Sequence, residues 1–320
     1  MKITGLEHLK DFNRILRAAV KRGPVLVCYL DGLGWYGYEE AVKRQAVPFI
    51  REHFFVNPME TVQPPLTNPA MATMLTGVLP DVHGVVSRKQ HRTLVPTVFS
   101  DVPDGILVEG DTIIIQTEVE QLLHTEAEAG NIDYSVFKDG MEQAKTEPPL
   151  LFLHFHGIDD AGHTFGPYAA ETLEKIREID EYIKQLAECW QGEIFLISDH
   201  GLHEVEEGNG GDHGKDNLED RTVIFGWHTK KTEQFPEIVP VAGMLELLAH
   251  NRDVSKIVFT GRDGYASVCS EQELQKEPGP QLRTGKGETC GSDTQRLAFP
   301  EEPIARRWCK DVTEVSVKFQ

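Results

Sequence analysis

The sequence contains no long apolar run. None of its segments reaches the about 18 consecutive apolar residues that a membrane-spanning helix requires. Residues 1–22 are charged and amphipathic, and they lack the apolar core and the cleavage site of a secretory signal. We therefore expect no membrane-spanning helix, no membrane as a partner, and a cytoplasmic location.

Cysteine is sparse and scattered. The five cysteines lie far apart in the chain, and no two of them form a Cys-x-x-Cys pair. An odd number of cysteines without such pairs argues against both a disulfide framework and a cysteine zinc site. Any metal site in this protein would therefore be built from nitrogen and oxygen ligands.

Positive charge is in deficit. The chain has 32 Lys and Arg against 51 Asp and Glu, and its formal net charge is −19 at pH 7. This balance argues against a nucleic-acid polymer or an anionic membrane as a partner. An enzyme with an anionic substrate would need a local source of positive charge, and bound metal ions are the obvious source.

Three nearly continuous apolar runs are present, at residues 25–30, 150–156 and 193–197. Such runs predict the buried strands of a parallel sheet. Residues 169–190 show the apolar periodicity of a helix. With 320 residues and 40% hydrophobic content, the chain can form one large α/β domain. We predict a mostly parallel central sheet flanked by helices on both faces.

The pattern is weaker elsewhere. Residues 111–115 predict a further strand and residues 134–144 a short helix. Near the C-terminus, residues 257–265 and 296–300 resemble short strands, and residues 308–317 alternate like an edge strand. We expect a main domain over residues 1–252 and a small β-rich appendage over residues 253–320, which is a candidate docking region for a protein partner.

Acids and histidines follow the predicted strands, at the edge of a sheet where ligands bind. Asp31 follows the first run, and Asp199 and His200 follow the third. Asp159 and His163 are four residues apart, so one helical turn would place them on the same face. Asp160 is the alternative ligand. All of these residues are also ordinary in turns, but their number and placement favour a divalent metal site.

A further histidine lies in a loop rich in acids and glycine. His213, with Gly214 after it, is either exposed or a metal ligand. The convergence of the strand-end acids and the two other histidines favours the ligand interpretation. His203 and Asp212 are additional candidates.

Thr67 stands just before a segment that favours a helix. Pro69 suits the first helical position, and Thr67 or Asn68 suits the N-cap. The N–H groups at a helix start form an anion site, where an alkoxide would be stabilised. Thr67 is therefore either a simple cap or a nucleophile. Residues 87–92 form a basic cluster, which is either a solvated surface or a phosphate clamp.

Taken together, these motifs resemble those of the alkaline phosphatase superfamily, and most closely its nucleotide pyrophosphatase/phosphodiesterase branch, whose nucleophile is threonine. The resemblance runs from residue 25 to about residue 248. It depends on the following motifs in this order: Asp31-Gly32, Thr67-Asn68-Pro69, Thr76-Gly77, Pro80-Asp81-Val82-His83-Gly84, residues 159–167, Ser198-Asp199-His200-Gly201 and Asp212-His213-Gly214.

The resemblance implies two divalent metal ions, zinc or alternatively manganese. One site would comprise Asp159, His163 and His213, and the other Asp31, Asp199 and His200. Thr67 would bridge them and attack phosphorus, and N–H groups near Asn68 would help to neutralise the phosphate oxygens. A phosphothreonine would form and be hydrolysed by water. The implied substrate is a small phosphate ester or anhydride.

One position departs from the diesterase pattern. Where that branch commonly has an asparagine that holds a phosphate oxygen, this sequence has Arg88. An arginine supplies a full charge and can reach a carboxylate or a second phosphate. A phosphomonoesterase, a phosphonate or sulfate ester hydrolase and a phosphomutase therefore stay open. From another class, a non-catalytic metal-bound accessory protein also stays open.

Overall fold

A computed structural model describes residues 8–124, 131–205 and 210–228, together with the backbone of three strands at residues 254–261, 264–269 and 312–319. By internal contacts the chain divides into two compact units, Glu7–Lys230 and Met1–Leu6 with Lys231–Gln320. The predicted boundary at residues 252 and 253 and the strand at residues 296–300 lie outside the described residues, so both stay predictions.

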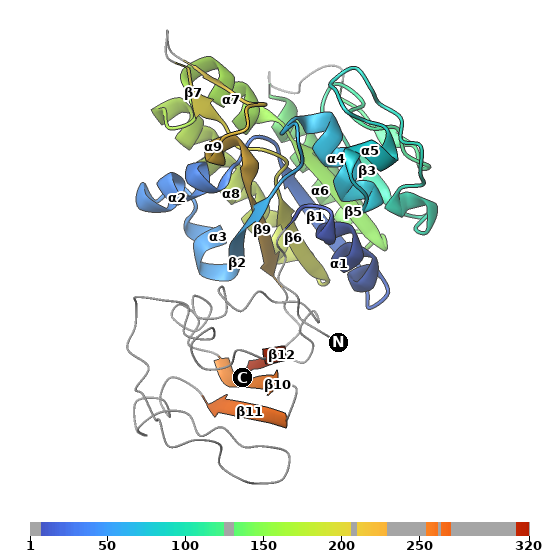
Figure 1. Ribbon diagram of the computed structural model, residues 1–320, viewed down its shortest axis with the longest axis vertical. Coiled ribbons are helices and arrows are strands. Elements are labelled where there is room, and N and C mark those ends of the chain that lie inside the picture. The colour runs from blue at the N-terminus through green and yellow to red at the C-terminus, as the bar shows by residue number, and fades with distance from the viewer. Residues whose placement is uncertain are drawn as a thin grey trace. The chain divides into compact units, whose positions relative to one another are not determined.

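The larger unit contains a seven-stranded sheet with the order β2-β9-β6-β1-β5-β3-β4 (Figure 1). Its strands are β1 (Val25–Leu30), β2 (Phe55–Glu60), β3 (Ile106–Val108), β4 (Gln121–Leu122), β5 (Leu150–Phe155), β6 (Glu193–Ile197) and β9 (Thr222–His228). Every pairing is parallel except the two that β9 makes with β2 and β6. The predicted mostly parallel α/β sheet is confirmed.

Helices cover both faces of this sheet (Figure 1). The α-helices are α1 (Asp11–Val20), α2 (Trp35–Lys43), α3 (Pro48–His53), α4 (Thr67–Thr76), α5 (Pro80–His83), α6 (Ile132–Ala144), α7 (Gly157–Phe165), α8 (Ala170–Cys189) and α9 (Leu218–Arg221), with a 3₁₀ turn η1 at Val98–Ser100. Within the described residues, no helix is long and apolar enough to cross a membrane.

The alternation of side chains along β1 divides the core into two layers. Leu26, Cys28 and Leu30 belong to the buried cluster that includes side chains of α3, α6 and α8. On another part of the sheet, Phe12 of α1 packs edge-on against Phe195 of β6, with ring centroids 5.9 Å apart. Since β1 is buried along its whole length, it reads as a continuous apolar run.

Two small sheets complete the described structure. The hairpin of β7 (His203–Glu204) and β8 (Gly211–Asp212) precedes His213. The smaller unit contains an antiparallel sheet with the order β11-β10-β12, formed by β10 (Val254–Gly261), β11 (Gly264–Cys269) and β12 (Val312–Phe319). β12 pairs only with β10 in this sheet and overlaps the edge strand predicted at residues 308–317, whose first residues lie outside the described residues.

The predicted strand at residues 111–115 is wrong, because these residues form no strand and the sheet strand in this region is β3. Their carbonyl groups bind side chains instead. The Asn68 amide donates to the Ile114 carbonyl at 3.0 Å, and the Gln121 amide donates to the Ile115 carbonyl at 2.8 Å. An apolar run whose carbonyl groups are taken by side chains cannot use them in a strand ladder.

The predicted start of α4 is also shifted. Leu66 is the N-cap, Thr67 is the first helical residue, and Pro69 is therefore the third. The prediction of Thr67 or Asn68 as the cap and Pro69 at the first position is wrong by one or two residues. Helix ends are the least reliable part of a sequence-based assignment. Thr67 nevertheless stays in the first turn, where free N–H groups lie.

Candidate active site

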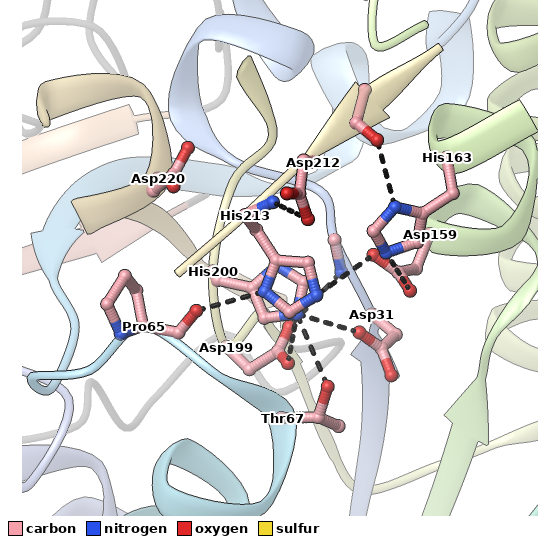
Figure 2. A network of polar contacts seen from close by, with 12 residues as sticks. Asp31, Pro65, Thr67, Asp159, His163, Asp199, His200, Asp212, His213 and Asp220 are labelled. Atoms are coloured by element: carbon pink, nitrogen blue, oxygen red, sulfur yellow. Dashed lines mark hydrogen bonds and ion pairs between the residues drawn. The ribbon is translucent and has the colours of Figure 1, made fainter. Parts of the chain in front are cut away.

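The predicted metal ligands meet at the carboxyl ends of three adjacent strands. Asp31 follows β1, Asp159 and His163 lie on α7 just after β5, and Asp199 and His200 follow β6. Because β6, β1 and β5 are parallel neighbours, their carboxyl ends share one edge of the sheet. Figure 2 shows these side chains, with His213 and Thr67, pointing toward one another.

Each of the three histidines is oriented by a backbone carbonyl. The Nδ1 contacts are His163 with Gly211 at 2.9 Å, His200 with Gly201 at 3.1 Å and His213 with Pro65 at 3.0 Å. A carbonyl oxygen only accepts, so each Nδ1 donates its proton and each Nε2 faces the carboxylates of the cluster. This is the arrangement that orients a metal-binding imidazole.

The first predicted ligand group is assembled. His163 Nε2 lies 3.3 Å from Asp159 Oδ2, and His213 Nε2 lies 4.0 Å from Asp159 Oδ1. One potential ligand atom from each of the three residues lies within 4.8 Å of the others. The helical turn predicted to bring Asp159 and His163 to one face is present as α7.

The second predicted ligand group surrounds His200. Its Nε2 lies 3.1 Å from Asp199 Oδ2 and 3.4 Å from Asp31 Oδ1. By mutual distance, Asp159 completes the group of Asp31 and His200 within 4.8 Å. The two predicted ligand groups therefore form one continuous cluster, with Asp159 between them.

Three carboxylate oxygens in this cluster are buried and accept no hydrogen bond: Asp31 Oδ1, Asp159 Oδ1 and Asp199 Oδ2. Buried carboxylates without partners are costly unless a cation is present. Three carboxylate oxygens and three imidazole nitrogens, without a thiolate, form a donor set that suits zinc or manganese. The residues present therefore fit divalent metal ions.

The electrostatics agree with this interpretation. Burial, and then the charge of Asp199, raise the pKa of Asp31 well above its ordinary value. Burial would raise the pKa of Asp159 as well, but the hydrogen bond with His163 and the neighbouring histidines lower it. Asp159 in turn raises the pKa of His163 to about 9, whereas burial lowers that of His213 to about 4.

Thr67 lies beside the cluster. Its Oγ1 is 3.3 Å from His200 Nε2, and the side chain is half-buried in the first turn of α4. The Asn68 amide points elsewhere, because it donates to the carbonyls of Gln90 at 3.1 Å and Ile114 at 3.0 Å. Asn68 can therefore offer an anion its backbone N–H, while its side chain anchors the loop that carries the basic cluster.

Arg88 reaches the cluster from that loop. Its Nη2 donates a hydrogen bond to His213 Nε2. The guanidinium group of this exposed residue therefore lies beside the cluster, where it could meet an anionic group. The other candidates lie apart: Asp160 and Asp212 are exposed, and His203 Nδ1 pairs with Asp220 Oδ1 at 2.8 Å.

Sequence reasoning missed a buried histidine below the cluster. His154 of β5 contacts Asp31 through Nε2 at 3.0 Å and Glu109 through Nδ1 at 2.6 Å. Burial would lower the pKa of His154, but the two carboxylates raise it to about 10. The available signal was a polar residue within an otherwise apolar run, at the strand that precedes the Asp159 motif.

Curated relatives match part of the chain. The GPI ethanolamine phosphate transferase 1 of Gibberella zeae is 26% identical over 230 residues, which cover 59% of this chain and 23% of that protein. The catalytic subunit of the human GPI ethanolamine phosphate transferase 3 is 30% identical over 108 residues, which cover 31% of this chain and 10% of that protein. The chain thus spans less than a quarter of the length of these relatives.

Solved structures share the fold. A 2-O GAG sulfatase superposes with a TM-score of 0.50 at 13% identity, over 68% of this chain and 66% of that chain. At this identity the likeness concerns the fold alone.

A family profile covers most of the chain. The profile of the type I phosphodiesterase / nucleotide pyrophosphatase family matches residues 25–102 and 111–260. These ranges include every predicted ligand, Thr67 and Arg88. The predicted resemblance to this branch of the alkaline phosphatase superfamily is confirmed, and the chain belongs to the type I phosphodiesterase / nucleotide pyrophosphatase family.

Proposed function

We propose that this protein is a metal-dependent enzyme that cleaves phosphodiester or phosphoanhydride bonds, with Thr67 as the nucleophile. The observation that carries this proposal is the position of the Thr67 hydroxyl. It lies 3.3 Å from His200 Nε2, beside a cluster with three unpartnered carboxylate oxygens. A hydroxyl beside such a cluster is placed for activation.

Six residues would hold the ions: Asp31, Asp159, His163, Asp199, His200 and His213. When bound, divalent ions supply positive charge that lowers the pKa of a nearby hydroxyl and offsets charge on a phosphate. Bound ions would also supply the local positive charge that an anionic substrate requires in a chain with a net charge of −19. Zinc and manganese are both compatible with the donor set.

Residues of the chain carry out the attack on phosphorus and bind the phosphate oxygens. Thr67 Oγ1 forms a bond to phosphorus as the bond to the leaving alkoxide or phosphate breaks, and the leaving group departs with that electron pair. The hydroxyl proton passes to solvent. N–H groups in the first turn of α4 and the Arg88 guanidinium donate to the phosphate oxygens. With a diester or anhydride substrate, the product on the enzyme is a threonine phosphodiester that keeps the remaining substituent of the phosphate.

The acceptor of the phosphoryl group held on Thr67 decides between two functions. With water as the acceptor, the enzyme is a hydrolase. With an alcohol as the acceptor, it is a transferase, and the relatives named as ethanolamine phosphate transferases favour this second candidate. A monoester is a further candidate substrate, because the full charge of Arg88 suits the second anionic oxygen of its phosphate.

The test compares hydrolysis of bis-p-nitrophenyl phosphate and p-nitrophenyl phosphate, with zinc or manganese added, for wild type and Thr67→Ala. We expect a preference for the diester and a loss of at least about 1,000-fold in kcat/KM in the variant, since removing a nucleophile removes the covalent route. Mass spectrometry of the acid-quenched wild type should show a peptide that contains Thr67 and carries a p-nitrophenyl phosphoryl group. Glycerol or ethanolamine added as an acceptor would reveal transfer.

Thr76→Ala is the matched control. Thr76 lies in the last turn of the same helix, and its hydroxyl donates to the Ala72 carbonyl at 2.7 Å. This variant should keep its activity. Diester hydrolysis that survives Thr67→Ala would contradict the covalent mechanism, and Thr67-dependent monoester preference would move the assignment to a phosphatase or mutase.

A further inference from the structure

A row of buried polar side chains crosses three neighbouring strands below the candidate active site. Tyr29 of β1 is the register partner of His154 of β5, and Glu109 follows β3, which pairs with β5 on its other side. All three residues have no exposed surface. The Tyr29 and His154 rings are stacked with centroids 3.9 Å apart, so the imidazole has little freedom to rotate.

His154 is held between two carboxylates. Its Nδ1 lies 2.6 Å from Glu109 Oε2, and its Nε2 lies 3.0 Å from Asp31 Oδ2. Each ring nitrogen of His154 therefore contacts one carboxylate oxygen at hydrogen-bond distance, and the two contacts fix the orientation of the ring.

The two carboxylate oxygens of Asp31 therefore have different partners. Oδ2 is occupied by His154, whereas Oδ1 has no hydrogen bond and faces His200 Nε2 at 3.4 Å. Asp199 is also held through one of its two oxygens, in this case by a backbone N–H group. Its Oδ1 accepts from the Gly32 N–H at 3.1 Å, and its Oδ2 has no hydrogen bond. Each carboxylate thus presents one fixed oxygen to the cluster.

We infer that Glu109 and His154 form a positioning pair that fixes Asp31 as a ligand through Oδ1 and sets the affinity of the ion that Asp31 binds. The inference rests on the proposed function, because it assumes that the cluster binds metal. It assigns roles to two residues outside the predicted ligand set. Neither residue contacts the substrate in this scheme, so both act through Asp31.

A third metal site is the competing interpretation of the same residues. Atoms of Asp31, His154 and His156 lie within 4.8 Å of one another. The geometry argues against it, since both ring nitrogens of His154 are already engaged by carboxylate oxygens at 2.6 Å and 3.0 Å. The positioning role therefore predicts that removing His154 weakens one existing ion and does not remove an additional one.

The test uses the full chain loaded with zinc and compares Glu109→Gln and His154→Asn with wild type. We measure bound zinc by elemental analysis and affinity by competition with a chromophoric chelator. One of two ions should bind about 10- to 100-fold more weakly in each variant, as for other groups that orient metal ligands. At subsaturating zinc, kcat for bis-p-nitrophenyl phosphate should fall while KM stays nearly constant.

Two buried residues outside the cluster provide matched controls. Glu193→Gln changes a buried acid that pairs with Arg22, and His83→Asn changes a buried histidine that contacts Thr73. Either control should leave zinc affinity unchanged, and thermal unfolding of all four variants separates a folding defect from a local one.

Three outcomes would overturn the inference. Equal weakening of both ions, or unchanged affinity with only a lower unfolding temperature, would make the pair merely structural. Loss of a third ion in His154→Asn would make His154 a ligand. A wild type that binds no zinc and cleaves no phosphate ester would overturn the proposed function as well, which distinguishes that failure from failure of the inference alone.

Discussion

At the scale of single residues, the partner of each ring nitrogen determines the behaviour of a histidine. His163 faces Asp159, which raises its pKa to about 9. His83 is buried away from the cluster, where its Nδ1 accepts from the Val85 N–H at 3.1 Å and its Nε2 contacts the Thr73 hydroxyl at 2.9 Å. Protonation of Nδ1 would place two N–H groups against each other, so the neutral form of His83 is the stable one.

His83 predicts a pH dependence of folding. Burial lowers its pKa from the ordinary 6.5 to about 4. The unfolded chain therefore binds a proton that the folded chain does not, and the stabilisation by neutral His83 is complete above pH 6.5 and lost as the pH falls toward 4. From pH 7 to pH 5, urea unfolding should show about 1 to 2 kcal/mol more destabilisation in wild type than in His83→Gln.

The difference between the two proteins is the informative quantity, since carboxylates titrate in both of them over this range. Parallel loss of stability in wild type and His83→Gln would contradict the assignment of this effect to His83.

At the scale of elements, the start of a helix must find acceptors for its first N–H groups. At the start of α4, the free N–H groups lie beside Thr67 and the cluster. At the start of α3, a carboxylate from another helix serves instead, because Asp180 of α8 accepts from the Phe49 N–H at 3.0 Å and the Ile50 N–H at 2.8 Å. The first N–H groups of α3 are thus satisfied by a side chain, whereas α4 has no side-chain cap.

Removing the Asp180 carboxylate should weaken the contact between α3 and α8. We expect Asp180→Ala to lower the free energy of unfolding by about 1 to 3 kcal/mol, because one buried and one partly buried N–H group lose their acceptor. Urea unfolding measures this loss. Glu181→Ala is the control, since the neighbouring Glu181 forms an exposed pair with Lys184. Equal effects of both substitutions would contradict the capping role.

At the scale of the whole molecule, the excess of negative charge is the main feature that disfavours the folded state. The net charge is −19, and three partnerless carboxylate oxygens converge at one edge of the central sheet. Ions that bind only the folded chain would stabilise it by mass action, by about 2.7 kcal/mol at a hundredfold excess over the dissociation constant. Metal binding should thus be visible as stability of the main unit.

Removal of metal is the corresponding experiment. We expect a chelator such as EDTA to lower the thermal unfolding temperature of zinc-loaded protein by roughly 5 to 10 °C, measured by scanning calorimetry. Added zinc should restore the original value. Asp159→Asn should respond much less, because Asp159 lies near the potential ligand atoms of both His163 with His213 and Asp31 with His200. An unchanged unfolding temperature after elemental analysis shows zinc loss would contradict a stabilising cluster.

Much of the sheet could be predicted, and less of the polar network. β1, β5 and β6 are readable because buried parallel strands are continuous apolar runs, and the acids after them mark one edge. β9 is antiparallel to its neighbours, which no local pattern indicates. The false strand at residues 111–115 and the buried pair of Glu109 and His154 depend on partners far away in the chain, so periodicity could not reveal them.

The sequence by itself thus determined the α/β class, the strand-end acids Asp31, Asp159 and Asp199, and the family motifs, because these depend on local order along the chain. Only the tertiary structure decided which atoms meet. It brought Arg88 to His213, turned the Asn68 amide toward a loop, and left one oxygen of Asp31 for the cluster. The physical reason is that a side-chain hydrogen bond is selected by distance and direction in space, and these exist only after distant segments have packed together.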